Sequence, residues 1–195
     1  MKESLIKQFI SENRFKSYKN LEEYSKNLIF SQNAYIPLSI LEVALRNALN
    51  NHLSNKISDI WYEDDFLTKD SIEKVSQAKS LLIKRRERTD KEKIIAELSF
   101  GFWVNLFKKP YDKKLRINDI KTIFPNLPNK EEKLINREIL FNKLNHIRNF
   151  RNRVFHYEKV LNKDNYNNIN EDIFEIIKYF DNELYIYTKE LFICR

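Results

Sequence analysis

The chain contains a single glycine, Gly101, and four prolines among its 195 residues. An all-β fold needs many tight turns, and those turns are built largely from glycine and proline. Apolar residues instead recur at helical spacing in most segments, separated by short polar breaks. The sequence therefore predicts an all-α fold, a helical bundle of about seven helices.

The apolar spacing also predicts where the helices lie. A leucine stripe gives the clearest segment, with Asn20 as an N-cap shortly before it. Gly101 indicates close helix packing or a kink, and the aromatic residues around it, 98–106, are expected in the core rather than on a base-stacking surface. The stripe is Leu38, Leu41, Leu45, Leu49 and Leu53, and the predicted helices are 3–12, 21–30, 34–56, 70–87, 91–107, 117–124, 130–157 and 171–192.

Length and composition set the domain organisation. With 42% hydrophobic and 13% aromatic residues, the chain can bury one sizeable core. We expect one domain over residues 1–195, with 1–20 as an N-terminal helical extension. The N-terminus lacks a cleavable apolar segment, and no stretch approaches the ~18 apolar residues of a membrane span. These features predict a cytoplasmic protein that does not bind a membrane.

Cofactor and metal sites find little support in the residues. Cys194 is the only cysteine, so neither an internal disulfide nor a cysteine-based metal site is expected. The three histidines are scattered, which argues against a zinc or two-metal nuclease site. One glycine cannot build a phosphate-binding loop. The prediction is a protein without metal or cofactor.

The most informative segment is 148–156, which holds three arginines, two asparagines and a histidine. On a helix, Arg148, Asn152 and His156 form one polar stripe flanked by Arg151. Neighbouring cations repel one another, and a phosphate would offset that repulsion. The net charge of +7 agrees with an anionic partner. The opposite, apolar side of the helix is expected to hold Ile147, Phe150, Val154, Tyr157 and Leu161.

The order Arg151, Asn152, three residues and His156 resembles the arginine and histidine signature of HEPN-domain ribonucleases. Further matching segments stand in the order seen in bacterial Abi-like proteins, of the AbiD and AbiF kind, which act in abortive-infection defence against phage. The resemblance covers roughly residues 20–165. The segments that carry it are 41–48, 98–103, Phe124-Pro125, and the positions from Arg148 to Glu158.

The resemblance implies a HEPN-type helical bundle, often dimeric, that cuts RNA without a metal as a toxin or defence effector. Arg151 and His156 would be the signature pair, and Asn152 its polar neighbour. Glu42 and Arg46 would correspond to the Glu and Arg of the family's earlier helix. Glu42 either pairs with Arg46 one turn away or braces Arg151 or His156.

The side chains themselves suit RNA cleavage by the 2′-hydroxyl. That reaction needs a base, an acid and a positive group on the phosphate. His156 fits either proton-transfer role, and Arg151 fits charge stabilisation. Arg148 and Arg153 would steer the substrate, while Asn152 would fix orientation. One histidine does not easily fill both proton-transfer roles, and Arg151 and His156 lie about 140° apart around a helix. We therefore expect a homodimer, or a higher homo-oligomer, that brings two such helices together.

Alternatives stay open at this point. The basic run Lys84, Arg85, Arg86 and Arg88 would contact the RNA backbone or form a solvated helix end. His52 and His146 are expected to be structural. Besides an endoribonuclease, the residues would suit a non-catalytic RNA-binding protein or a regulatory HEPN partner. A bound noncoding RNA or an acidic antitoxin protein would be its inhibitor.

Overall fold

A computed structural model describes residues 5–193, in which no strand occurs and the fold is all-α. The described residues form nine α-helices rather than about seven. The predicted fold class is therefore confirmed, while several boundaries differ. The α-helices are α2 (Glu12–Phe15), α3 (Leu21–Lys56), α4 (Lys69–Lys84), α5 (Lys91–Glu97), α6 (Phe100–Asn105), α7 (Ile117–Ile123), α8 (Arg137–Phe155), α9 (Ile169–Phe180) and α10 (Asn182–Ile193). Shorter turns are the π-helix η1 (Ile6–Ile10) and the 3-10 helices η2 (Trp61–Glu63), η3 (Lys109–Tyr111) and η4 (Asp164–Tyr166).

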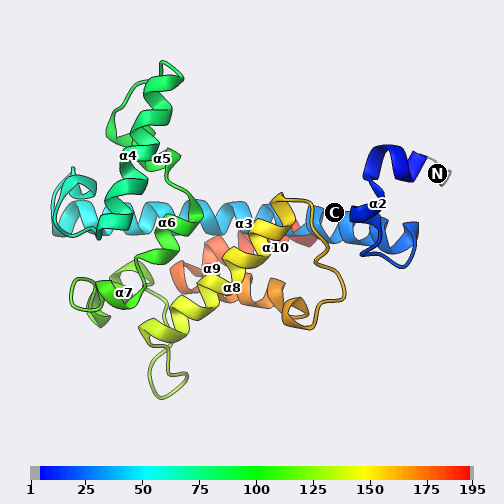
Figure 1. The fold of residues 1–195 in the computed structure, drawn as a ribbon. Helices are drawn as coiled ribbons and strands as arrows, with labels where there is room; N and C mark the ends of the chain where they lie inside the picture. Colours follow the sequence, from blue (N-terminus) through cyan, green and yellow to red (C-terminus); the bar gives the residue numbers. More distant parts are fainter. Residues whose placement is uncertain (1–4, 194–195) are drawn as a thin grey trace.

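Helix α3 runs across the whole width of the molecule in Figure 1 and replaces the two helices predicted at 21–30 and 34–56. The expected break at 31–33 was wrong because the buried stripe of the helix continues through it. From Leu38 the stripe extends back through Ala34 to Asn27 and Glu23, all buried. Because Asn27 and Glu23 are polar, apolar spacing alone did not predict that the stripe continues into this part of the helix. Pro37 lies inside the helix.

Two other predicted helices are each divided by a polar cap. The segment 91–107 separates into α5 and α6, where the Ser99 hydroxyl accepts a hydrogen bond from the Phe102 amide at 3.3 Å. The segment 171–192 separates into α9 and α10, where the Asp181 carboxylate accepts from the Glu183 amide at 2.7 Å. Such side chains satisfy the free amides of a new helix. Both segments therefore bend where one continuous helix was expected.

The remaining boundaries move by up to seven residues. Asn136 caps α8, so this helix begins at Arg137 instead of 130 and ends at Phe155 instead of 157. Helix α4 ends at Lys84, three residues before its predicted end. Of the predicted helix 3–12, residues 1–4 lie outside the described part of the chain. The rest forms η1 and the start of α2, with Ser11 between them at a φ of 71°.

One hydrophobic cluster reaches from Ala34 to Tyr179 and is organised around α3, which packs against α6, α7, α9 and α10. The leucine stripe is completely buried or nearly so. Phe100, Phe102 and Trp103 are buried as well, which confirms that these aromatic residues are core. Helices α4 and α5 project from this body as an arm (Figure 1).

Gly101 lies on α6 where this helix meets α8. A Cβ atom added at this position would stand 3.5 Å from Cδ of Arg148, an ordinary contact distance. An alanine would therefore fit at this position, so packing against α8 does not require the glycine.

Length and composition alone would allow α3 to cross a membrane, with a mean hydropathy of 1.4 over 18 residues. This corrects the expectation that no stretch approaches a membrane span. The leucine stripe of α3 is packed inside the bundle, while 28% of the 18-residue segment is buried. The cytoplasmic location stays a prediction.

Acid should weaken the fold through Glu175, on α9. Burial raises the pKa of this carboxyl, but hydrogen bonds from Lys133, Lys143 and Tyr179 outweigh burial and lower the pKa from 4.5 to about 2. A depressed pKa contributes stability above the ordinary value, and this contribution is lost as the pH falls from 4.5 through about 2. Urea unfolding across this window should show a smaller loss of unfolding free energy in Glu175→Gln than in the wild type. Parallel profiles would contradict this assignment.

Candidate functional site

The polar stripe of α8 ends in a tight turn that exposes His156. The amide of Tyr157 donates to the carbonyl of Val154 at 3.0 Å, and the amide of Glu158 donates to that of Arg153 at 2.8 Å. These two bonds form a Schellman motif in which His156 is the C-cap and Tyr157 takes the left-handed position, at a φ of 56°. His156 is exposed on this turn, beyond the last helical residue.

Tyr157 corrects a prediction. We expected it on the buried apolar side with Ile147, Phe150 and Val154, which are indeed buried. Because the helix has already ended, the left-handed turn places the Tyr157 ring outside, where 69% of the residue is exposed. Leu161, also expected there, is partly buried in the following loop.

Arg151 is held between an acid and an aromatic ring. Its Nη2 lies 3.3 Å from Oε2 of Glu42 on α3, and its guanidinium lies 4.3 Å from the centre of the Phe155 ring. Phe155 in turn contacts Tyr35 of α3, with ring centres 6.0 Å apart. Of the two alternatives for Glu42, the structure has the pair with Arg151. Arg46 instead donates to the Asn47 side chain at 3.4 Å.

Arg148 lies one turn before Arg151 and is oriented by neutral groups. Its Nη1 and Nη2 donate at 3.5 Å to the side-chain oxygens of Asn105 and Asn149 respectively. The Nε atoms of Arg148 and Arg151 are both buried without a partner among the described residues. Amide oxygens leave the charge of Arg148 locally uncompensated, which favours an anion beside it.

The other predicted RNA-binding residues lie in two places, on α8 and at the end of α4. Asn152 is exposed on the α8 stripe, whereas Arg153 pairs with Glu158 at 2.6 Å. The basic run lies at the end of α4, on the arm that projects away from α8 (Figure 1), so the fold does not bring it to His156. Within this run, Arg85 pairs with Glu97 at 2.9 Å and Arg88 with Asp90 at 3.0 Å; the other members are Lys84 and Arg86.

The two remaining histidines make structural contacts, as expected. Nε2 of His52 lies 2.8 Å from Asp119, which joins α3 to α7. Burial raises the pKa of Asp119, but hydrogen bonds, that from Lys56 first, outweigh it and lower the pKa. His146 stacks on Tyr166 at 5.3 Å between ring centres.

Asn27, which the sequence did not single out, fixes the loop that follows His156. Its Oδ1 accepts from the amides of Val160 and Leu161 at 2.8 and 3.0 Å. Its Nδ2 donates to the carbonyl of Glu158 at 3.3 Å and to the hydroxyl of Tyr18 at 3.2 Å. With 1% exposure, this side chain satisfies its polar atoms entirely within the protein.

A second contact one turn earlier on α3 holds the same loop. Glu23 accepts hydrogen bonds from Lys159 at 2.8 Å, from the amide of Lys19 at 2.6 Å and from Asn162 at 3.1 Å. The bond from Lys159 contributes most to lowering the pKa of Glu23 from 4.5 to about 2. This carboxylate therefore stays charged and ties the loop to the segment before α3.

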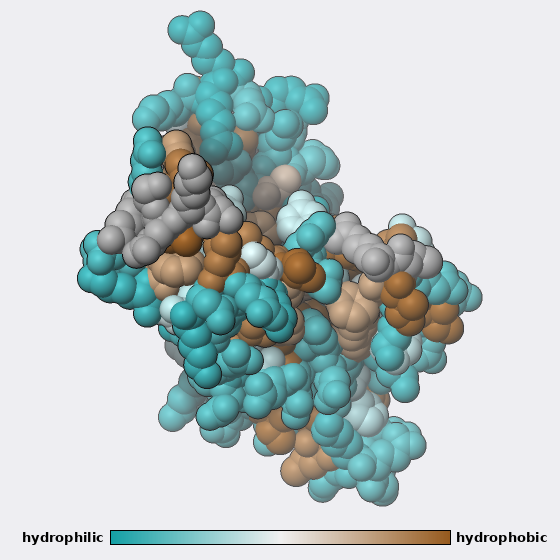
Figure 2. Space-filling model, turned by 90° about the vertical axis from the view of Figure 1, so that its right-hand side faces the viewer, coloured by the Kyte–Doolittle hydropathy of each residue, from teal (hydrophilic) through white to brown (hydrophobic). Residues whose placement is uncertain are grey.

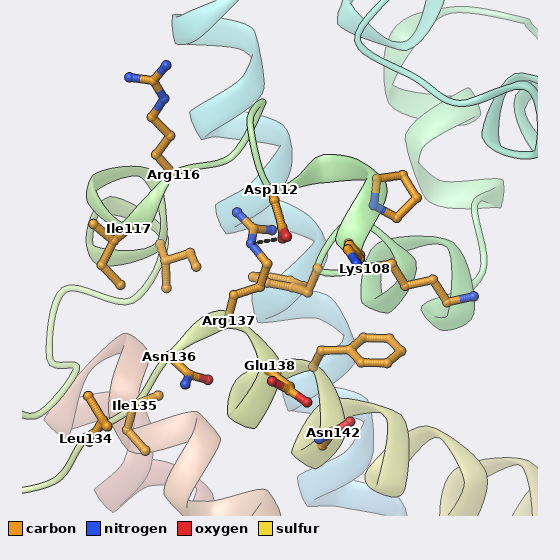
Figure 3. A pocket seen from close by; sticks show the side chains of 15 residues that line it. Lys108, Asp112, Arg116, Ile117, Leu134, Ile135, Asn136, Arg137, Glu138 and Asn142 are labelled. Carbon is orange, nitrogen blue, oxygen red and sulfur yellow. Dashed lines mark ion pairs between the residues drawn. The ribbon is translucent and has the colours of Figure 1, made fainter.

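A cavity of about 1060 Å³ lies at the other end of α8 (Figure 3). It is lined by residues of η3, α7 and the start of α8, and none of the predicted site residues takes part. Arg137 pairs there with Asp112 at 2.9 Å. Burial lowers the pKa of this guanidinium, an effect that Asp112 opposes.

Comparison with known proteins gives no further guide: no family model, curated protein or solved structure matches the chain. Residues 5–193 also contain no group of three or more His, Cys, Asp and Glu side chains that would hold a metal ion. Cys194, the only cysteine, lies outside the described residues. The assignment of the site therefore rests on the geometry of α3, α8 and the turn that follows α8.

Replacing Asn27 should loosen the turn beside His156. Asn27→Ala leaves two loop amides and a carbonyl without their partner, at a cost of about 1–3 kcal/mol in unfolding free energy. Asn27→Asp keeps the acceptor but loses both donated bonds and turns a buried carboxylate oxygen toward the carbonyl of Glu158, so a cost at least as large is expected. Chemical denaturation measures both effects, and hydrogen exchange should speed up at Val160 and Leu161 in Asn27→Ala. Unchanged exchange at these two amides would show that Asn27 does not hold the loop.

Proposed function

We propose that the protein is a metal-independent endoribonuclease of the HEPN type, acting as a toxin or effector in bacterial abortive-infection defence. The observation that carries the proposal is the Glu42 and Arg151 pair beside the exposed His156 turn. The family resemblance favours Glu42 as the partner of Arg151 or His156. The observed ion pair joins α3 to α8, two helices far apart in the sequence. Arg148 and Asn152 extend the same stripe.

In this proposal each side chain has a separate role in attack by the 2′-hydroxyl on phosphorus. His156 takes the proton of the nucleophile or gives one to the leaving 5′-oxygen. Arg151, oriented by Glu42 and the Phe155 ring, stabilises the charge that develops on the phosphate oxygens. Arg148 holds a neighbouring phosphate, and Asn152 orients it.

We further propose that two copies of the chain together form the complete site. Leu28, Tyr35 and Glu42 are seven residues apart on α3 and so share one face of the helix. Leu28 and Tyr35 are 43% and 53% exposed, and Tyr35 contacts Phe155, itself 39% exposed, directly before His156. The side of the molecule at which α3 begins, on the right in Figure 1, also shows hydrophobic side chains between hydrophilic ones (Figure 2). A two-fold axis here would bring two histidines together.

A second function is favoured by one contact. The guanidinium of Arg151 is already engaged by Glu42 and by the Phe155 ring, which leaves less of it to stabilise a transition state. A non-catalytic RNA-binding protein or a regulatory HEPN module would need only the positive stripe. In either case a noncoding RNA or an acidic antitoxin would bind this surface as inhibitor.

Substitution of His156 tests catalysis directly. Wild-type protein incubated with total RNA and with tRNA in EDTA should leave 2′,3′-cyclic phosphate ends, whereas His156→Ala should lose cleavage by about 10²-fold or more while keeping RNA binding. His146→Ala removes a histidine of the same helix that stacks on Tyr166, and it should still cleave. Equal cleavage by the two variants, or none by the wild type, would contradict the proposed mechanism.

The composite site predicts that activity depends on the dimer. Glu substitutions at Leu28 and Tyr35 place two carboxylates in the proposed contact, so light scattering should show a monomer, with cleavage reduced in parallel. Ile83→Glu is the matched control, because this residue is 66% exposed on the α4 arm. A fully active wild-type monomer would exclude the shared site.

A further inference from the structure

A second cavity, of about 320 Å³, adjoins the turn that carries His156. One wall comes from the N-terminal segment 13–18, and the other from the end of α8 and the loop after it. These segments lie more than a hundred residues apart in the chain, and the hydrogen bond from Arg14 Nη1 to the carbonyl of Tyr157, at 3.2 Å, joins them. The lining residues are Asn13, Arg14, Ser17, Tyr18, Arg153, Tyr157, Glu158, Lys159 and Lys163.

The charge of this cavity is positive. Four cations line it, and two of them have a carboxylate partner: Arg153 pairs with Glu158 at 2.6 Å, and Lys159 with Glu23 at 2.8 Å. Arg14 instead donates to a neutral carbonyl, and Lys163 is the fourth lining cation. Glu158 is the one acid among the lining residues, so the cavity carries an excess of positive charge that suits a phosphate.

Tyr157 supplies an aromatic ring at the edge of the cavity. Its left-handed backbone, at a φ of 56°, is a conformation that glycine adopts far more easily than tyrosine. Packing in the core does not explain an aromatic residue here, because 69% of Tyr157 is exposed. A strained backbone that keeps an exposed aromatic side chain is typical of a functional position.

We propose that this cavity is a nucleotide subsite for single-stranded RNA, placed directly beside His156. A base stacks on the Tyr157 ring, while Arg14 and Lys163 bind its flanking phosphates. Because Tyr157 follows His156 in the chain, a nucleotide held here positions the neighbouring linkage at the histidine. The subsite rests on the proposed function, and it gives the N-terminal segment a role in substrate binding.

The experiment measures binding separately from cleavage. His156→Ala protein is titrated against a fluorescein-labelled single-stranded oligoribonucleotide, and anisotropy gives Kd at several salt concentrations. Tyr157→Gly, added to this background, removes the ring but keeps the turn, since glycine favours the same backbone; it should raise Kd roughly 5- to 150-fold. Tyr157→Phe keeps the ring and should bind like its parent.

A second test variant and its control examine the proposed phosphate contact. Arg14→Gln should weaken binding and reduce the slope of log Kd against log salt by about one. Lys16→Gln removes an equally charged residue of the same segment, one that pairs with Glu12 and does not line the cavity, and it should change Kd less. Thermal unfolding of each variant confirms that the fold is kept.

The outcomes separate the two proposals. Unchanged Kd and salt slope in Tyr157→Gly and Arg14→Gln would overturn the subsite even if the wild type cleaves RNA. Weakened binding in both variants, together with a wild type that cleaves nothing, would support the subsite and overturn the endoribonuclease. No measurable RNA binding by the parent protein would overturn the subsite outright.

Discussion

The continuity of α3 is the constraint on which the rest of the molecule depends. A helix of 36 residues is about 54 Å long, so its two ends can organise different parts of the fold. Its C-terminal half supplies the leucine stripe against which α6, α7 and α9 pack. Its N-terminal half contributes polar side chains that hold the loop after His156. The core and the candidate site are thus built on a single rigid element.

The two halves of α3 work by different chemistry. Burial of the leucines is nondirectional and tolerates small adjustments, while the hydrogen bonds of Asn27 and Glu23 fix individual loop atoms. A loop bound only by apolar contacts would leave His156 free to adopt several positions. The buried amide gives this turn one arrangement, which a catalytic or binding group requires.

Sequence reasoning worked where the signal was periodic. The helical class, the leucine stripe and the buried aromatic cluster around Trp103 follow from spacing and composition alone. It failed at Ser99 and Asp181, where a single capping side chain ends one helix and starts another without interrupting the apolar pattern. It also failed at 31–33, because the buried residues before this point, Asn27 and Glu23, are polar and have the sequence pattern of an exposed helix face.

The candidate site shows the same division. Arg148, Asn152 and His156 lie along one helix, so spacing alone could group them, and the family resemblance led to Glu42. Contacts from Asn27 and Arg14 to the main chain leave no such trace, since a carbonyl or an amide belongs to every residue. The exposure of Tyr157 required the position at which α8 ends, which differed from the prediction by two residues.

The scarcity of glycine also affects the denatured chain. Arg86, Tyr157 and Asn162 all occupy left-handed positions, and in the Schellman turns that end α4 and α8 it is Arg86 and Tyr157 that stand where glycine is common. Residues with a Cβ atom sample fewer backbone conformations than glycine when unfolded, so less conformational entropy is lost when the chain folds. Local strain in the native turns is therefore offset, at least in part, by a stiffer unfolded state. The same property that makes these turns unusual favours folding of the whole chain.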